Sequence, residues 1–189
     1  MIRMKSESGL TLLELLITIS IGVVLFAIGM PSYRYVTNSN RATTEVNALL
    51  GDMQYARSEA IKEGQPVTVC PLTGTAPNFN CAANTNTWQG GWIVFSDVNG
   101  NANVDTATDV ILHVQQPFSV ATDSFVSDNN VYAVTYNREG FATGLPATTN
   151  GYVTVTLHTS PLNSAWTRCL QLGTYGTAST LRFNNGSCQ

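Results

Sequence analysis

The sequence has 189 residues and few charges, since only 11% of the residues are Asp, Glu, Lys or Arg. Its formal net charge is −3 at pH 7, which argues against non-specific attraction to nucleic acid, because that attraction requires a positive field. Asn, Thr, Ser and Gly are abundant, which fits an exported β-rich domain rather than a cytosolic enzyme.

The N-terminus begins with a polar, basic leader, residues 1–9, followed by an apolar segment, residues 10–33. From Leu10 to Met30 the only ionisable side chain is Glu14. At about 1.5 Å per residue this stretch is roughly 32 Å long as a helix, close to the thickness of a bilayer's hydrocarbon core. We therefore expect a transmembrane helix with a cytoplasmic N-terminus. About 155 residues remain outside it, enough for one domain with its own core.

Glu14 is the unusual residue of this segment. A carboxylate inside a membrane costs about 2.5–3.5 kcal/mol on insertion scales, so it indicates a function. The apolar segment contains no cation, so the partner of Glu14 must come from outside the chain. A cleaved secretory signal is disfavoured because no A-x-A-like site follows Met30. An ordinary membrane anchor remains the simpler alternative.

Residues 34–64 are predicted to form an amphipathic helix that continues the apolar one. Its apolar residues recur near i, i+3, i+4 and i+7 spacing: Val46, Leu49, Leu50, Met53, Ala56, Ala60 and Ile61. Arg41 and Glu45 are four residues apart and are predicted on a more polar face. Gly64, followed by Gln65-Pro66, is a typical helix end. The whole helix would be about 80 Å long.

Residues 65–189 are predicted to form a β-rich globular head. Six β-branched and aromatic runs are predicted strands: 67–70, 91–97, 110–115, 131–136, 152–158 and 168–172. Antiparallel sheets over the C-terminal half of the helix would bury the apolar faces of both. The predicted class is α+β.

The four cysteines, Cys70, Cys81, Cys169 and Cys188, all follow the apolar segment. In an oxidising compartment they should form two disulfides, and three pairings are possible. Proximity favours Cys70–Cys81 and Cys169–Cys188. Their spacings do not resemble the C-x-x-C pairs of zinc sites, so we expect neither a metal nor another cofactor.

The segment from Asp97 to Asp109 allows two interpretations. Alternating oxygen donors resemble a calcium loop: Asp97, Asn99, Asn101, Asn103 and Asp105. The sixth position of an EF-hand would be Ala102 rather than Gly, and the twelfth Thr108 rather than Glu. An Asn/Gly turn whose side chains hydrogen-bond their own backbone is the favoured interpretation.

Catalytic motifs are absent from the sequence. His113 and His158 each fall within a predicted strand, and neither a G-x-S-x-G elbow nor an H-E-x-x-H helix occurs. We expect that the protein is not an enzyme. An exported enzyme attached to the membrane is the competing hypothesis.

The N-terminal motif Ser8-Gly9-Leu10-Thr11-Leu12-Leu13-Glu14 resembles the class III signal, G-F-T-L-x-E, of type IV pilins and type II secretion pseudopilins. Leu10 replaces the commoner Phe. The resemblance implies cleavage between Gly9 and Leu10 by a prepilin peptidase, then N-methylation of Leu10. It also implies that Glu14 pairs with the N-terminal amine of a neighbouring subunit, which sets assembly register. Pro31 falls where such helices commonly kink.

The head resembles the GspH/FimT family of minor pilins and pseudopilins. Residues 54–61 resemble its x-x-A-R-S-E-A-x signature, and residues 136–144 its aromatic-x-x-x-G loop. The W-x-x-F-x-D-x-N-x-N run from Trp92, the strand at 168–172 and the terminal Cys188 resemble FimU-like members. This implies a type IV pilin-like fold, a long N-terminal α-helix packed on an antiparallel β-sheet head.

The resemblance implies a minor pilin that enters, or primes assembly of, a type IV pilus. The expected partners are the major pilin, other minor pilins, prepilin peptidase, the inner-membrane assembly platform and, before assembly, membrane lipid. The expected location is the inner membrane, crossed once with a periplasmic head, and then the cell-surface pilus. Alternatives are a minor pseudopilin of a type II secretion system and a DNA-uptake pilus component. DNA is an unlikely partner because residues 176–179 lack the arginines of the G-R-x-R motif found in some relatives.

Overall fold

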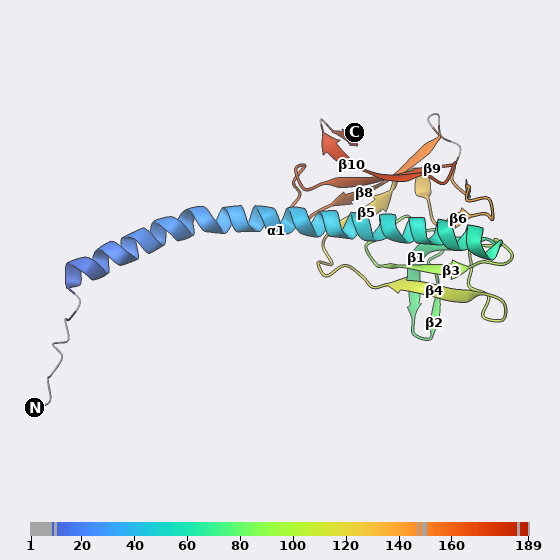
Figure 1. The fold of residues 1–189 in the computed structure, drawn as a ribbon, viewed down its shortest axis with the longest axis horizontal. Coiled ribbons are helices and arrows are strands. Elements are labelled where there is room, and N and C mark those ends of the chain that lie inside the picture. The colour runs from blue at the N-terminus through green and yellow to red at the C-terminus, as the bar shows by residue number, and fades with distance from the viewer. Residues whose placement is uncertain (1–8, 10, 147, 149–150, 185, 189) are drawn as a thin grey trace, which may run out of the picture. The chain divides into compact units, whose positions relative to one another are not determined.

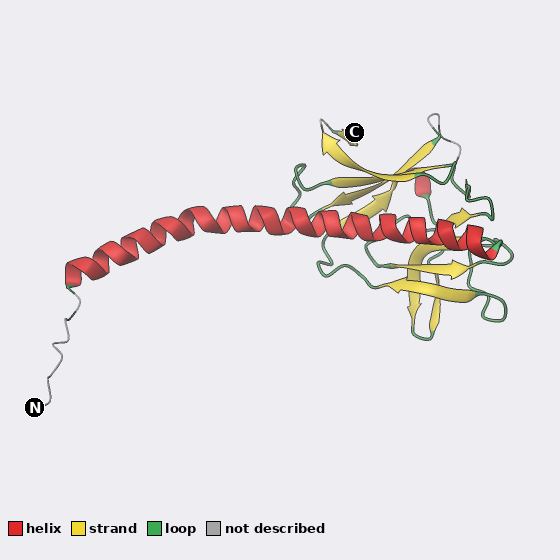
Figure 2. Ribbon diagram, viewed as in Figure 1, coloured by secondary structure: helices red, strands yellow, loops and turns green. Residues whose placement is uncertain are grey.

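The computed structural model describes residues 9, 11–146, 148, 151–184 and 186–188. The predicted leader up to Ser8, and Leu10 at the predicted cleavage and methylation site, lie outside the described residues. The chain forms two compact units, Met1–Asn38 and Ser39–Gln189, which we describe separately. The fold class is α+β, as the sequence predicts: one long helix and antiparallel sheets (Figure 2).

Helix α1 extends from Leu12 to Glu63 (Figure 1). The hydroxyl of Thr11 accepts a hydrogen bond of 3.2 Å from the backbone N–H of Glu14, which caps the first turn. Pro31 lies inside the helix. The helix ends where the sequence predicts, because Gly64 adopts a left-handed conformation with φ of 70°.

The first unit exposes the large apolar side chains of α1. Between Leu12 and Met30 they are all at least half exposed, with Leu12 at 78% and Phe26 at 71%. The helix is long and apolar enough to cross a membrane by length and composition. Exposure on this scale is stable only in lipid or against other proteins.

In the second unit, α1 buries one stripe of side chains: Ala42, Glu45, Val46, Leu49, Met53, Ala56 and Ala60. Two expectations need correction. Ile61 is 53% exposed, and Glu45 is only 9% exposed rather than on a polar surface. Glu45 lies beside Arg41 and Asp123 in the folded head, whereas Ile61 lies in the last turn of α1.

The first sheet has six strands, in the order β4-β3-β1-β6-β7, with β2 paired to β1. Its strands are β1 (Val67–Thr75), β2 (Asn78–Cys81), β3 (Trp92–Ser96), β4 (Val110–Gln115), β6 (Val134–Tyr136) and β7 (Ala142–Thr143). All of its ladders are antiparallel. Strand β3 is buried at every position, as expected of a strand covered on both faces.

The second sheet has the order β11-β10-β9-β8-β5 and is also antiparallel. Its strands are β5 (Ser124–Ser127), β8 (Tyr152–His158), β9 (Arg168–Gly173), β10 (Ala178–Asn184) and β11 (Ser187–Cys188). In β8 burial alternates strictly, with Val153, Val155 and Leu157 inside. One core cluster joins the buried stripe of α1 to residues of both sheets.

The predicted strand 131–136 is shorter in the structure and begins at Val134. A 3-10 turn, Asp128–Asn130, precedes it. The hydroxyl of Ser127 donates to the carbonyl of Val131 and accepts from its N–H, so this residue is held outside the ladder. Strands β2, β5, β7, β10 and β11 are absent from the prediction.

Candidate functional site

Glu14 is exposed and lies at the third position of α1, in the first turn, where the helix dipole favours a negative charge. Thr11 and Glu14 have the spacing of a capping box, a signal that the sequence analysis missed. Within the described residues, Glu14 has no ion-pair partner. Gly9 is exposed, and Leu10 lies outside the described residues.

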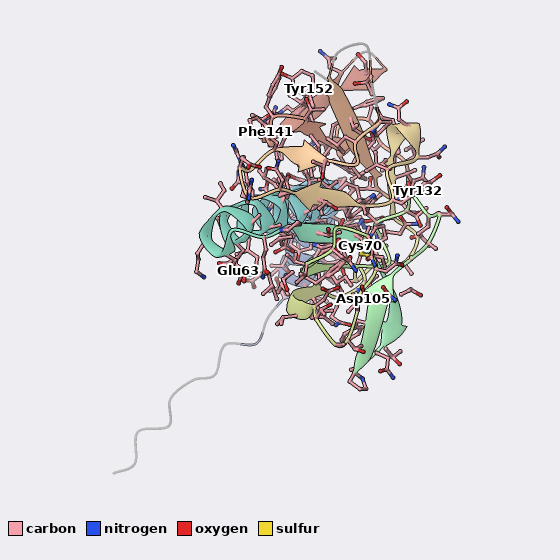
Figure 3. The ribbon with its side chains drawn as sticks, turned by 90° about the vertical axis from the view of Figure 1, so that its right-hand side faces the viewer. Glu63, Cys70, Asp105, Tyr132, Phe141 and Tyr152 are labelled. Carbon is pink, nitrogen blue, oxygen red and sulfur yellow. A yellow bond between two sulfur atoms is a disulfide. The ribbon has the colours of Figure 1, made fainter. Side chains whose placement is uncertain are left out.

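Two disulfides close loops in the head. They join Cys70 to Cys81 and Cys169 to Cys188, which are the two pairings that proximity favours. The first ties β1 to β2, and Figure 3 shows Cys70 within the head. The second fastens β11 to β9 across β10. Each loop is short enough for a stabilisation of about 3 kcal/mol by the chain-entropy estimate.

Asp97 is fully buried and organises the loop after β3. Its carboxylate accepts hydrogen bonds from the hydroxyl of Thr68 at 2.7 Å, the N–H of Ala102 at 2.9 Å and the N–H of Asn101 at 3.0 Å. Buried carboxylates are stable when donors surround them in this way. Ala102 adopts a left-handed conformation with φ of 56°, which the tight loop imposes.

The other candidate calcium ligands also bond to the loop itself. The side-chain amides of Asn99 and Asn101 donate to Asp105, and the N–H of Asn103 donates to the side-chain oxygen of Asn101. Among the described residues no group of three or more His, Cys, Asp or Glu side chains could hold a metal. The geometry fits the Asn-rich turn.

Two further side chains, which are not among the candidate calcium ligands, complete this loop. Asp109 accepts from the N–H groups of Val98 and Asp105, and Asn80 of β2 accepts from the N–H of Val104. Asp105 accordingly lies beside the β1–β2 hairpin (Figure 3). The alternation of Asn and Asp predicts the turn, but only folding brings β2 to it.

The two histidines make structural contacts. The Nδ1 atom of His113 lies 3.1 Å from the carboxylate of Asp52 on α1. The same carboxylate accepts a 2.7 Å hydrogen bond from the indole N–H of Trp92, so Asp52 joins the helix to β3 and β4. His158 lies 3.3 Å from the hydroxyl of Thr167.

A buried ionic cluster lies under α1. Arg41 pairs with the buried carboxylate of Asp123 at 2.9 Å, and Asp123 also accepts from the N–H of Ser160 at 2.7 Å. Glu45 shares this site, and its Oε2 atom is buried without a hydrogen-bond partner among the described residues. Burial, reinforced by the charge of Asp123 and opposed by Arg41, raises the pKa of Glu45 to about 7.

Replacing Glu45 with Gln should remove a pH dependence of stability. The pKa of Glu45 in the folded chain, about 7, lies above the ordinary glutamate value of 4.5 that holds in the unfolded chain. Between these two pH values the unfolded chain releases a proton that the folded chain keeps, so the free energy of unfolding falls as pH rises. At pH 8 we expect Glu45→Gln to be more stable by about 2–3 kcal/mol, and at pH 4 nearly equal to wild type. Urea unfolding of the full chain in detergent, followed by tryptophan fluorescence, measures this.

The control for that experiment is Glu59→Gln, which removes a carboxylate that pairs with Lys62 on the exposed side of α1. Its free energy of unfolding should depend on pH in the same way as that of the wild type. If the free energy of unfolding depends on pH equally in the wild type and in Glu45→Gln, then Glu45 is already ionised in the folded protein.

A pocket of about 480 Å³ lies between the end of α1 and the turn that leads into β10. Arg57 and Ile61 of α1 line it, with Gly176 and Thr177 opposite. The Gly140 turn reaches the same place, because an added Cβ there would meet Arg57 and Ile61. Three segments far apart in sequence therefore meet around Arg57.

The comparisons with known proteins agree with this architecture. The family described as Type II transport protein GspH matches residues 45–176, and the Prokaryotic N-terminal methylation motif matches residues 4–30. Among curated proteins no match is found.

Two crystal structures of the type IV minor pilin FimU from Pseudomonas aeruginosa have a similar fold. One has 16% identity and a TM-score of 0.55, covering 83% of this chain and 96% of that one. The other has 16% identity and a TM-score of 0.52, covering 78% of this chain and 94% of that one. At this identity the likeness concerns the fold alone.

Proposed function

Because this chain belongs to the GspH/FimT family of type IV minor pilins and pseudopilins, we propose that it is a minor pilin of a type IV pilus. One observation carries the proposal: a carboxylate without an ion-pair partner among the described residues begins a helix whose apolar side chains are exposed. Both features are costly in an isolated chain and are satisfied together by packing against other such helices.

In this mechanism each part of the chain has a separate role. Prepilin peptidase cuts between Gly9 and Leu10, and the new terminus is methylated at Leu10. The apolar part of α1 holds the precursor in the inner membrane and later packs in the filament core, where Pro31 allows a kink. Glu14 pairs with the terminal amine of a neighbouring subunit. The head lies in the periplasm first and then on the filament surface.

The proposed partners are the major pilin, other minor pilins and the assembly platform of the inner membrane. The family consists of structural proteins rather than enzymes, and the proposed role requires no catalysis. The filament would gain a specialised subunit that primes assembly or adds a distinct surface.

The second candidate is a minor pseudopilin of a type II secretion system, which the description of the matching family favours. The two candidates differ in where the protein is found. A pilin is recovered from sheared surface filaments, whereas deletion of a pseudopilin stops protein secretion and leaves surface pili intact.

The mass of the protein from sheared surface filaments tests the processing step. We expect the chain to lack residues 1–9 and to carry one methyl group on Leu10. The precursor in the membrane of a strain without prepilin peptidase is the matched control and should keep the leader. Functional filaments that contain the uncut chain would contradict the proposal.

A further inference from the structure

Arg57 is held in place by two glycines from different loops. An added Cβ on Gly140 or on Gly176 would lie 3.0 Å from the Nε atom of Arg57, and the one on Gly176 would also overlap the carbonyl oxygen of Gly140. Both glycines are left-handed, with φ of 81° and 75°. The absence of both side chains makes the space that the arginine occupies.

The guanidinium of Arg57 lacks an anion. Its Nε atom is buried without a hydrogen-bond partner, and within the described residues Arg57 makes no hydrogen bond or ion pair. Arg41, Lys62 and Arg138, by contrast, each pair with a carboxylate at 2.9 Å or less. A partly buried cation without a partner costs free energy, so an external anion would be favoured there.

Tyr136 does not supply the missing charge. Burial raises the pKa of Tyr136 to about 12, although the nearby charge of Arg57 opposes this shift. The phenol therefore stays neutral at physiological pH. Asp and Glu side chains are also missing from the lining of the pocket within the described residues.

We propose that the pocket around Arg57 binds an acidic side chain from the head of a neighbouring pilin subunit. The inference rests on the proposed function, because it requires a filament neighbour. A guanidinium binds a carboxylate through two parallel hydrogen bonds, and Ser58 and Thr177 line the same pocket.

The shape and charge of the pocket favour a protein carboxylate. Residues 39–189 contain ten Asp and Glu against six Lys and Arg, and seven of these acids remain outside the core when the buried Glu45, Asp97 and Asp123 are set aside. Acidic side chains are therefore available on a head of this kind. Ile61 and Ala178 also line the pocket, and their apolar side chains suit the stem of a single Glu or Asp. A nucleic-acid backbone would need several cations in a row, whereas Arg57 is the one cation that lines this pocket in the described part of the chain.

The test measures filament entry of Arg57→Gln, which removes the charge and keeps much of the volume. We expect about tenfold less protein in sheared filaments at an unchanged amount in the membrane, the effect of losing one charge-assisted pair. Arg57→Lys should recover only part of this loss. The matched control is Arg138→Gln, because Arg138 is exposed and pairs with its neighbour Glu139, so wild-type entry is expected.

A photocrosslinking amino acid in place of Ser58 identifies the occupant in assembled filaments. We expect a crosslink to a pilin near an Asp or Glu, and exchange of that acid with Arg57 should restore entry. The melting temperature of Arg57→Gln should equal or exceed that of wild type. Three results would each overturn the inference. The first is normal entry of Arg57→Gln into filaments, the second is a lowered melting temperature that explains its reduced entry, and the third is a crosslink to nucleic acid. Absence of the wild-type protein from filaments would instead refute the proposed function.

Discussion

Replacing Glu14 with Ala is expected to leave the protein in the membrane and to reduce its entry into filaments by about a hundredfold. The charge costs about 2.5–3.5 kcal/mol in an apolar environment, and the amine of a neighbouring subunit offsets this cost only after assembly. Glu14→Ala removes both the free-energy cost of the charge in lipid and its attraction to the amine of the neighbouring subunit. Membrane insertion should therefore persist, while the preference for one assembly register is lost. The measurement compares the protein in membranes and in sheared filaments by immunoblot.

Glu14 could instead serve to cap α1, and two further variants distinguish this capping role from a role in setting the assembly register. Glu14→Gln keeps an amide that can take part in a capping box but has no charge, so it should fail like Glu14→Ala. Thr11→Ala removes the observed cap at a cost of about 1 kcal/mol and keeps the carboxylate, so it should still enter filaments. If Thr11→Ala fails and Glu14→Gln succeeds, the carboxylate has a capping role only.

Replacing Asp97 with Ala is expected to destabilise the head by about 3–4 kcal/mol. Three donors would lose their shared acceptor: the hydroxyl of Thr68 and the N–H groups of Asn101 and Ala102. Donors that stay buried without a partner cost about 1–3 kcal/mol each, and partial access of water to the loop reduces the sum. Urea unfolding of the full chain in detergent gives the difference.

Asp105→Ala is the matched control. The carboxylate of Asp105 accepts from the side-chain amides of Asn99 and Asn101, and both amides are exposed, so water can replace the lost acceptor. This substitution should cost less than about 1.5 kcal/mol. Added calcium should leave the melting temperature of the wild type unchanged, because the oxygens of Asp97 already bind donors. A rise in melting temperature with calcium would revive the calcium interpretation.

Local signals in the sequence determine the helix and much of the sheet pattern. The helix ends at Glu63 because Gly64 permits the left-handed turn, and the alternation in Tyr152–His158 matches the burial of β8. The apolar run from Leu10 to Met30 with its single acid likewise identifies the N-terminal segment without any tertiary contact.

The tertiary structure decided everything that depends on distant partners. Arg41 lies four residues from Glu45, so the sequence predicts an exposed polar face, yet Glu45 is buried near the charge of Asp123 in the folded head. Short strands such as β2 and β11 have too few residues for a pattern and exist through their ladders and disulfides. Arg57, Gly140 and Gly176 meet although the two glycines lie in loops more than thirty residues apart. Contacts between such distant residues result from tertiary packing, so no periodic pattern in the sequence predicts them.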